Sequence, residues 1–183
     1  RGSSGVVPRK GRRRVEEEGG TPRIKRSFPP IVDPHVRLMV LGSLPGDISL
    51  AAGRYYANPR NHFWSLIGSV IEKDLVTLDY AARLDALLAA HVGLWDTVEA
   101  AERTGSLDTN IRTHRPNRLA ELAASLPRLA AFGFNGGKAA AIGTRQLAGV
   151  EGIELVALPS SSPAFTLPLA HKREQWLALR RFL

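Results

Sequence analysis

A run of aromatic and amide side chains, YYANPRNHFW, occupies residues 55–64 of the sequence. The ring of Tyr56 offers a flat face on which a nucleic-acid base can stack. Asn61 carries both a carbonyl acceptor and an amide donor, so its side chain can hold a water molecule or a base edge. The alternative is structural, because an asparagine can cap a helix and aromatic side chains often belong to the core. We favour the structural role for Phe63 and Trp64, and the functional role for Tyr56 and Asn61.

Four polar segments rich in glycine, proline or serine follow short apolar runs along the chain. They are GSLPGD at residues 42–47, WDTVEA at 95–100, FNGGKA at 134–139 and LPSSSPAF at 158–165. A loop like the first one exposes rigid backbone N–H groups that can bind an anion or a base edge, although many ordinary turns look the same. We expect a pocket to form where the four segments converge.

Composition limits the chemistry that these segments can support. The chain has no cysteine, which excludes disulfides, cysteine-ligated iron–sulfur clusters and a thiol nucleophile. Its five histidines lack the close spacing of a zinc-binding helix, so we expect neither a metal nor any other cofactor. The sequence shows no apolar run of membrane-spanning length and no secretory segment. We therefore expect a soluble monomer of the bacterial cytoplasm or nucleoid, with no membrane partner.

Positive charge is concentrated near the start of the chain. Residues 1–30 contain nine basic and three acidic groups, a net charge of +6, whereas residues 31–183 contain 16 basic and 14 acidic groups, a net charge of +2. The first segment lacks hydrophobic periodicity, so we expect a disordered tail over 1–30 and a single domain over 31–183, with residues 28–31 docking the tail. A basic tail suits a polyanion such as DNA, but a solvated leader fits the composition equally well.

Short strands and helices alternate along residues 31–183. Apolar runs predict strands at 37–41, 92–95, 128–134 and 153–158, and helical spacing predicts helices at 59–71, 79–91, 117–126, 136–147 and 168–183. This alternation predicts an α/β fold, a three-layer α/β/α sandwich with a central parallel sheet. Ligands bind such sheets outside the carboxyl ends of the strands, which is where the four polar segments lie.

Taken in order, these segments resemble the uracil-DNA glycosylase superfamily. The similar parts are the GxxPG loop that begins at Gly42, the YANPRNHFW segment and the LPSSSP segment. GLWDTVEAAERTGSLDTNI at 93–111 and FGFNGGKAA at 132–140 are similar to its hypoxanthine-DNA glycosylase branch. The resemblance runs from about Arg37 to Trp176 and implies a four-stranded parallel sheet between helices. It also implies an enzyme that flips a damaged nucleotide out of DNA and hydrolyses its N-glycosidic bond.

The resemblance further implies which residues form the base pocket. Ser43, Leu44 and the backbone of the first loop would line the pocket near the deoxyribose and the attacking water. Tyr56 would stack on the flipped base, and Asn135 would help to shape the pocket. Many relatives place a catalytic Asp or Asn where this chain has Leu44, which cannot orient water or transfer a proton. Relatives with a strong uracil preference place a histidine where this chain has Leu158.

Catalysis would then depend on Asn61 and Asp96. Asn61 would position the water, since the similar branch also lacks both missing groups and uses the asparagine of this segment. An amide can orient water but cannot act as a base at neutral pH. Asp96 stands where some relatives keep a base-reading asparagine, and its carboxylate is also a candidate for the catalytic group itself. A helix-capping role is the structural alternative for Asp96.

The last loop would contact the DNA. Its serines, Ser160, Ser161 and Ser162, would bind phosphates beside the lesion, and Phe165 would enter the duplex. The expected substrate is DNA with a deaminated base, uracil or hypoxanthine, and the expected product is an abasic site.

Two other functions remain open on the residues alone. The first is a non-catalytic module that binds DNA lesions, because Leu44 and Leu158 are residues that a disabled enzyme would carry. The second is a small hydrolase using Ser43 or Ser160. That reading is weaker, because no GxSxG turn is present and no His and Asp stand in an obvious position to activate either serine.

Overall fold

A computed structural model describes residues 23–183, apart from the side chain of Thr113. Its central sheet has four parallel strands in the order β3-β2-β6-β7. The strands are β2 (Leu38–Gly42), β3 (Val92–Asp96), β6 (Ala131–Asn135) and β7 (Glu154–Leu158). Every residue of β2 and β6 is buried, as expected for the middle strands of a sheet that is covered on both faces. The predicted four-stranded parallel sheet is confirmed.

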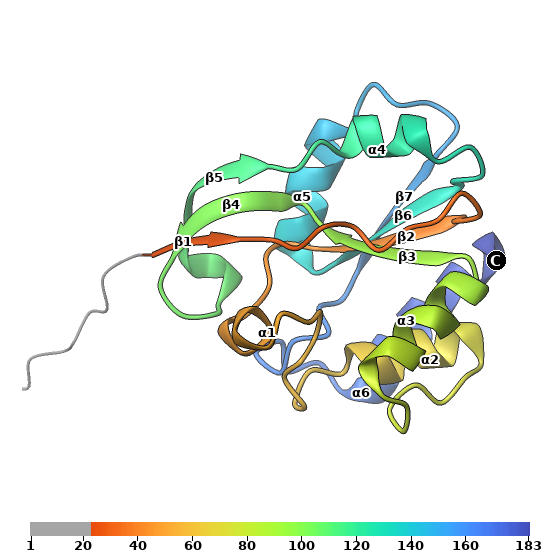
Figure 1. The fold of residues 1–183 in the computed structure, drawn as a ribbon, viewed down its shortest axis with the longest axis horizontal. Helices are drawn as coiled ribbons and strands as arrows, with labels where there is room; N and C mark the ends of the chain where they lie inside the picture. The colour runs from red at the N-terminus through yellow and green to blue at the C-terminus, as the bar shows by residue number, and fades with distance from the viewer. Residues whose placement is uncertain (1–22) are drawn as a thin grey trace, which may run out of the picture.

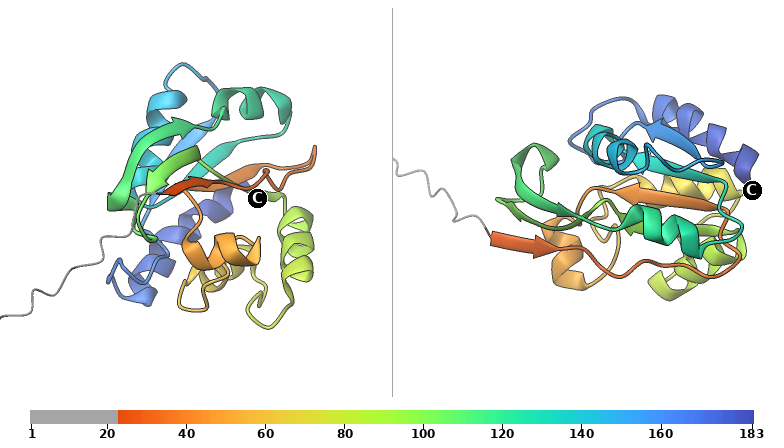
Figure 2. Two further views of the ribbon diagram at one scale, coloured as in Figure 1. Left: turned by 60° about the vertical axis from the view of Figure 1, so that its left-hand side comes forward. Right: turned by 90° about the horizontal axis from the view of Figure 1, so that it is seen from above.

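Helices cover both faces of this sheet and make three layers (Figures 1 and 2). They are α1 (Asp47–Ala52), α2 (Phe63–Ile71), α3 (Tyr80–Ala89), α4 (Leu119–Ser125), α5 (Gly137–Gln146) and α6 (Leu169–Trp176), and a 3₁₀ helix (Leu177–Phe182) continues α6. Helices α4 and α5 lie on one face, and α2, α3 and α6 on the other. Within residues 23–183, no helix combines the length and the apolar character needed to cross a bilayer.

Local sequence explains where individual helices begin. The carboxylate of Asp79 accepts a hydrogen bond from the backbone N–H of Ala82 (2.8 Å) and so caps α3, as its position predicts. The apolar face of α2 packs on α6 and on the buried ring of Trp176. These contacts fix the segment that precedes α2, which carries Tyr56 and Asn61.

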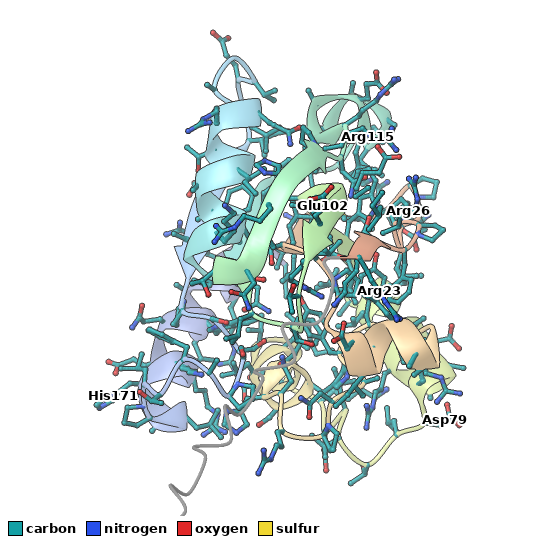
Figure 3. All side chains as sticks on the ribbon, turned by 90° about the vertical axis from the view of Figure 1, so that its left-hand side faces the viewer. Arg23, Arg26, Asp79, Glu102, Arg115 and His171 are labelled. Atoms are coloured by element: carbon teal, nitrogen blue, oxygen red, sulfur yellow. The ribbon has the colours of Figure 1, made fainter. Side chains whose placement is uncertain are left out.

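A second sheet has no counterpart among the predicted elements. It is antiparallel, with the order β1-β4-β5, and consists of β1 (Arg23–Arg26), β4 (Val98–Arg103) and β5 (Ile111–Pro116). Figure 3 shows charged side chains on all three strands, among them Arg23 and Arg26 on β1, Glu102 on β4 and Arg115 on β5. Such charged strands resemble loops in a hydropathy pattern, which is why the hairpin was not predicted.

The predicted boundary at residue 30 is wrong for residues 23–30. Strand β1 pairs with β4, and the ring of Phe28 meets that of Tyr55 edge-on with centroids 5.2 Å apart. Ile31 then forms a backbone bridge with Leu94, so residues 28–31 dock on the domain as expected. Backbone hydrogen bonds to β4 hold this polar stretch in place. A hydropathy pattern does not reveal backbone pairing, so the sequence predicted a tail here. The rest of the predicted tail, residues 1–22, lies outside the described residues.

Candidate active site

One cavity of about 880 Å³ opens at the carboxyl ends of the parallel strands, between the last loop, α1 and the β4–β5 hairpin. This volume lies in the range of small-molecule pockets. Every site residue predicted from the sequence lines it: Ser43, Leu44, Tyr56, Asn61, Asp96, Asn135, Ser160, Ser161, Ser162 and Phe165. The fold therefore brings together side chains that lie far apart in the sequence, while their individual roles stay predictions.

Tyr56 forms one wall of the cavity. Its ring stacks on that of Phe63, with centroids 3.7 Å apart and planes 13° apart. Its hydroxyl accepts a hydrogen bond from Asn135 Nδ2 (3.1 Å), and burial together with the nearby Asp96 raises its pKa. The backbone of Tyr56 has φ of 51°, a left-handed conformation that costs a tyrosine energy and that the surrounding contacts must hold. The ring is thus held by Phe63 and Asn135, and the residue lines the cavity.

Asn135 connects this wall to the last loop. Its Nδ2 also donates to Ser161 Oγ (2.8 Å), and its Oδ1 accepts from the backbone N–H of Ser161 (2.8 Å). Both ends of the amide are therefore used inside the protein. This arrangement supports the pocket-shaping role expected of Asn135, and it turns the buried Ser161 hydroxyl toward the protein.

Asp96 lies deep in the cavity, with only 3% of its surface exposed. Its Oδ2 atom has no hydrogen-bond partner among residues 23–183. Its carboxyl group passes directly over Gly42, because a Cβ at that glycine would lie 2.7 Å from Asp96 Oδ1 and 3.1 Å from Tyr56 Oη. Gly42 is therefore required for the close approach of β2 to these two groups.

Burial raises the pKa of Asp96 to about 8, and the negative charge of Asp108 adds to the effect, while Arg103 opposes it. At neutral pH most molecules therefore hold a proton on this carboxyl. A protonated carboxyl can donate a hydrogen bond into the cavity, which a carboxylate cannot do.

Asn61 lies two residues before α2 and five residues after Tyr56 in the sequence. Its Oδ1 accepts a hydrogen bond from the backbone N–H of Phe63 (3.0 Å). This is the helix-start role that was considered as the structural alternative. In the described part of the chain, its Nδ2 has no protein partner and the residue borders the cavity, so it can still bind water as a donor.

The β4–β5 hairpin adds two polar residues that the sequence analysis missed. The side chain of Asp108 accepts a hydrogen bond from Ser43 Oγ (2.5 Å) across 65 residues of sequence. Arg103, with 1% of its surface exposed, donates to the carbonyls of Leu44 (3.3 Å) and Pro45. Both lie within residues 93–111, the segment that resembles the hypoxanthine-DNA glycosylase branch. That resemblance is the one feature of the sequence that could have marked these two residues as functional.

Leu44 has a packing role as well as a place on the cavity wall. Its buried side chain forms an apolar cluster with Val98, Ala101 and Ile111 of the hairpin. The backbone N–H of Thr97 donates to the carbonyl of Gly42 (2.8 Å) and that of Val98 to the carbonyl of Ser43 (3.0 Å), which completes the connection between the first loop and β4. The leucine therefore anchors the hairpin beside the pocket.

The last loop forms the outer rim of the cavity. Ser160 and Ser162 each accept a backbone N–H within the loop, from Ser162 and Ala164, and in the described residues neither hydroxyl donates to the protein. Phe165 is 47% exposed at this rim. Below it the buried Lys172 donates to the carbonyl of Ser162 (3.1 Å), with its Nζ 5.4 Å from the Phe165 ring centroid.

The described residues offer no evident metal site. Among residues 23–183, no group of three or more His, Asp or Glu side chains is arranged to hold a metal ion. The polar groups that line the cavity are amides, hydroxyls, the three carboxyls of Asp47, Asp96 and Asp108, and the cations Arg112 and Lys138. This set can bind a base, a sugar and phosphates directly.

Comparisons with known proteins agree with this architecture. The family model described as the uracil DNA glycosylase superfamily matches residues 29–180. A hypoxanthine DNA glycosylase from Methanosarcina barkeri is 38% identical over 152 residues, which cover 83% of this chain and 95% of that protein. Another from Methanosarcina acetivorans is 37% identical over 158 residues, covering 86% and 99%.

A solved structure leads to the same class. A solution NMR structure of a candidate uracil DNA glycosylase from Methanosarcina acetivorans superimposes with a TM-score of 0.77 at 36% identity, covering 87% of this chain and 99% of that one. Fold and cavity thus define an α/β/α domain that takes its ligand at the carboxyl ends of parallel strands. Within that class, the chain belongs to the uracil DNA glycosylase superfamily.

Proposed function

We propose that this DNA glycosylase removes a deaminated base, hypoxanthine and to some extent uracil, from DNA by hydrolysis and leaves an abasic site. The observation that carries the proposal is the buried carboxyl of Asp96, whose pKa burial raises to about 8, beside Tyr56 in a cavity of about 880 Å³. Two relatives named hypoxanthine DNA glycosylase support the choice of hypoxanthine as the first substrate. Leu158, which stands in place of the histidine of uracil-selective relatives, supports it too.

Base binding would begin with a flipped nucleotide. Removing a base from the stack costs a few kcal/mol, and least when the base is mispaired, as a deaminated base often is. Stacking on Tyr56 and phosphate contacts from the hydroxyls of Ser160 and Ser162 would offset this cost. Phe165 would fill the space that the base leaves in the duplex.

Bond cleavage would then depend on charge. As the N-glycosidic bond breaks, positive charge develops on the sugar and negative charge on the leaving base. The protonated Asp96 would donate to an acceptor atom of that base, and a fixed donor in a buried site stabilises such charge effectively. Asn61 and the first loop would hold the attacking water near the sugar.

A panel of labelled oligonucleotides tests this proposal. Each would contain one deoxyinosine, deoxyuridine or unmodified base, in single-stranded or duplex form, and would be treated with alkali after incubation. We expect alkali-labile sites with deoxyinosine, fewer with deoxyuridine, and none with normal bases. Asp96→Asn should lower the single-turnover rate by at least 100-fold, whereas Asp85→Asn on the exposed face of α3 should not change it.

The same panel separates the alternatives. A lesion-binding module would retain the oligonucleotides without producing alkali-labile sites, and that result would contradict the enzymatic proposal. Strand breaks that appear without alkali would contradict a monofunctional enzyme, and Lys138, which lines the cavity, would be the amine to test.

A further inference from the structure

We propose that Asp108, carried into the cavity by the β4–β5 hairpin, is the carboxylate that binds the attacking water and accepts its proton, in concert with Ser43. This inference rests on the proposed function and adds a catalytic residue to it. It assigns a chemical role to the hairpin, which the sequence had not revealed. It also supplies a carboxylate in place of the one that the first loop lacks at position 44, where this chain has Leu44.

The position of Asp108 carries the inference. It begins a 3₁₀ turn (Asp108–Asn110) between the two strands, and its side chain borders the cavity. Its Oδ1 accepts a short hydrogen bond of 2.5 Å from Ser43 Oγ, on the loop that follows β2. Since the outer turn of a hairpin is normally solvent-exposed and variable in position, a specific bond of this kind indicates a fixed geometry.

The first loop and the hairpin are held together by more than this bond. Arg103 connects them by donating to the carbonyls of Leu44 and Pro45 on one side and of Gly105 (2.8 Å) on the other. The Leu44 side chain packs among apolar hairpin residues below. The Asp108 carboxylate is therefore positioned rigidly beside Ser43, as a group that must hold a water molecule should be.

Asp96 and Asp108, two of the three carboxyls that line the cavity, have different charges around them. Burial raises the pKa of both. For Asp108, the Ser43 hydroxyl and the cations Arg103 and Lys138 counteract burial and favour the charged form. For Asp96, only Arg103 does so, and the charge of Asp108 acts in the opposite direction. These surroundings favour the charged form more at Asp108 than at Asp96, the difference expected between a base and an acid that share a site.

The proposed step balances with water alone. The water oxygen forms a bond to C1′ of the sugar while the bond from C1′ to the base nitrogen breaks, and the electron pair of that bond leaves with the base. The base takes the proton of Asp96, and Asp108 takes a proton from the water. The products are the free base and the abasic sugar with its new hydroxyl. Asp108 then loses its proton to solvent and Asp96 regains one.

The experiment is the pH dependence of the single-turnover rate with a deoxyinosine oligonucleotide at saturating enzyme. For the wild type we expect a bell-shaped profile, with an acidic limb set by Asp108 and an alkaline limb near pH 8 set by Asp96. Asp108→Asn should lower the plateau rate by about 100-fold or more and remove the acidic limb. Affinity for the oligonucleotide should change by less than about 3-fold. A tenfold change would correspond to about 1.4 kcal/mol of binding free energy.

Two further variants make the result specific. Ser43→Ala should move the acidic limb to higher pH, because the carboxylate loses the hydrogen bond that stabilises its charged form. Glu102→Gln removes an exposed carboxylate from the same hairpin and should leave both the rate and the profile unchanged. Circular dichroism and urea unfolding of each variant would show whether the hairpin still folds.

The outcomes separate the inference from the function on which it rests. If the wild type cleaves deoxyinosine and Asp108→Asn does so at the same rate, or with the acidic limb intact, the inference is overturned and the proposed function stands. A wild-type chain that produces no abasic site from any oligonucleotide overturns both.

Discussion

The ring of Tyr56 lies flat against the ring of Phe63, with centroids 3.7 Å apart, and the same residue has a left-handed backbone with φ of 51°. The two observations belong together. The unusual backbone turns the side chain back over α2, where Phe63 supports one face of the ring. Asn135 fixes its hydroxyl, so the ring reaches the cavity as a preorganised surface.

Tyr56→Ala should weaken both binding and cleavage. Stacking of one base on an aromatic ring contributes about 1–3 kcal/mol, so we expect a loss of roughly 5- to 150-fold in kcat/KM for deoxyinosine DNA. Tyr56→Phe retains the ring and loses only the hydrogen bond to Asn135. Its kcat/KM should therefore fall by less than about tenfold. Single-turnover and titration measurements on the two variants would check this. Equal losses for both would show that the hydroxyl, not the ring, is what the site requires.

The raised pKa of Asp96 predicts how stability changes with pH. Its pKa is about 8 in the folded chain against 3.8 when exposed, so between these values the folded state holds a proton that the unfolded state has lost. Stability should therefore fall as pH rises from about 4 to 8, by at most about 1.4 kcal/mol per pH unit from this group.

Asp96→Asn isolates that contribution. The asparagine carries no titrating proton, so the free energy of unfolding should depend less on pH in this window than in the wild type. Urea unfolding of both proteins at pH 5 and pH 8 measures the difference. Two parallel pH dependences would mean that Asp96 does not retain its proton on folding.

The sequence predicted the parallel sheet well because its signals are local. Buried strands such as Leu38–Gly42 are continuous apolar runs, and caps such as Asp79 mark helix starts. The pocket followed from topology, since the carboxyl ends of parallel strands converge. The individual side chains were harder, because Asn61 uses its oxygen at the start of α2 and Ser161 points inward to Asn135.

The hairpin could not be predicted in the same way. Its strands carry exposed charges such as Glu102, and β1, which pairs with β4, lies 74 to 80 residues away along the chain. Arg103 looked like one more charged residue of a polar stretch, yet it is among the most deeply buried side chains in the described residues. Only three-dimensional contacts reveal a buried guanidinium that binds the carbonyls of another loop.

Arg103→Met should therefore destabilise the protein strongly. The substitution leaves the Leu44 and Pro45 carbonyls without their donor and removes the cation that lowers the pKa of Asp96 and of Asp108. Breaking a buried arrangement of this kind costs about 3–5 kcal/mol. Arg103→Lys retains the charge but not the planar guanidinium with its several donors. Its loss of stability should lie between zero and that of Arg103→Met.

Urea unfolding of these variants measures the cost. Arg118→Met, which breaks an exposed pair with Glu121, serves as the control and should cost no more than about 1 kcal/mol. A methionine variant as stable as the wild type would show that the hairpin and the first loop do not depend on Arg103.

Phe165 gives the sharpest test of how the enzyme opens a duplex. Its ring is 47% exposed on the rim of the cavity, above the buried Lys172. A wedge matters only where a base must leave a stack, so Phe165→Ala should slow cleavage of deoxyinosine in a duplex by about tenfold or more and change the single-stranded rate little. Val76→Ala, which shortens an exposed apolar side chain outside the cavity, should alter neither rate. If Phe165→Ala slows both substrates equally, the ring contacts the nucleotide itself and does not act on the duplex.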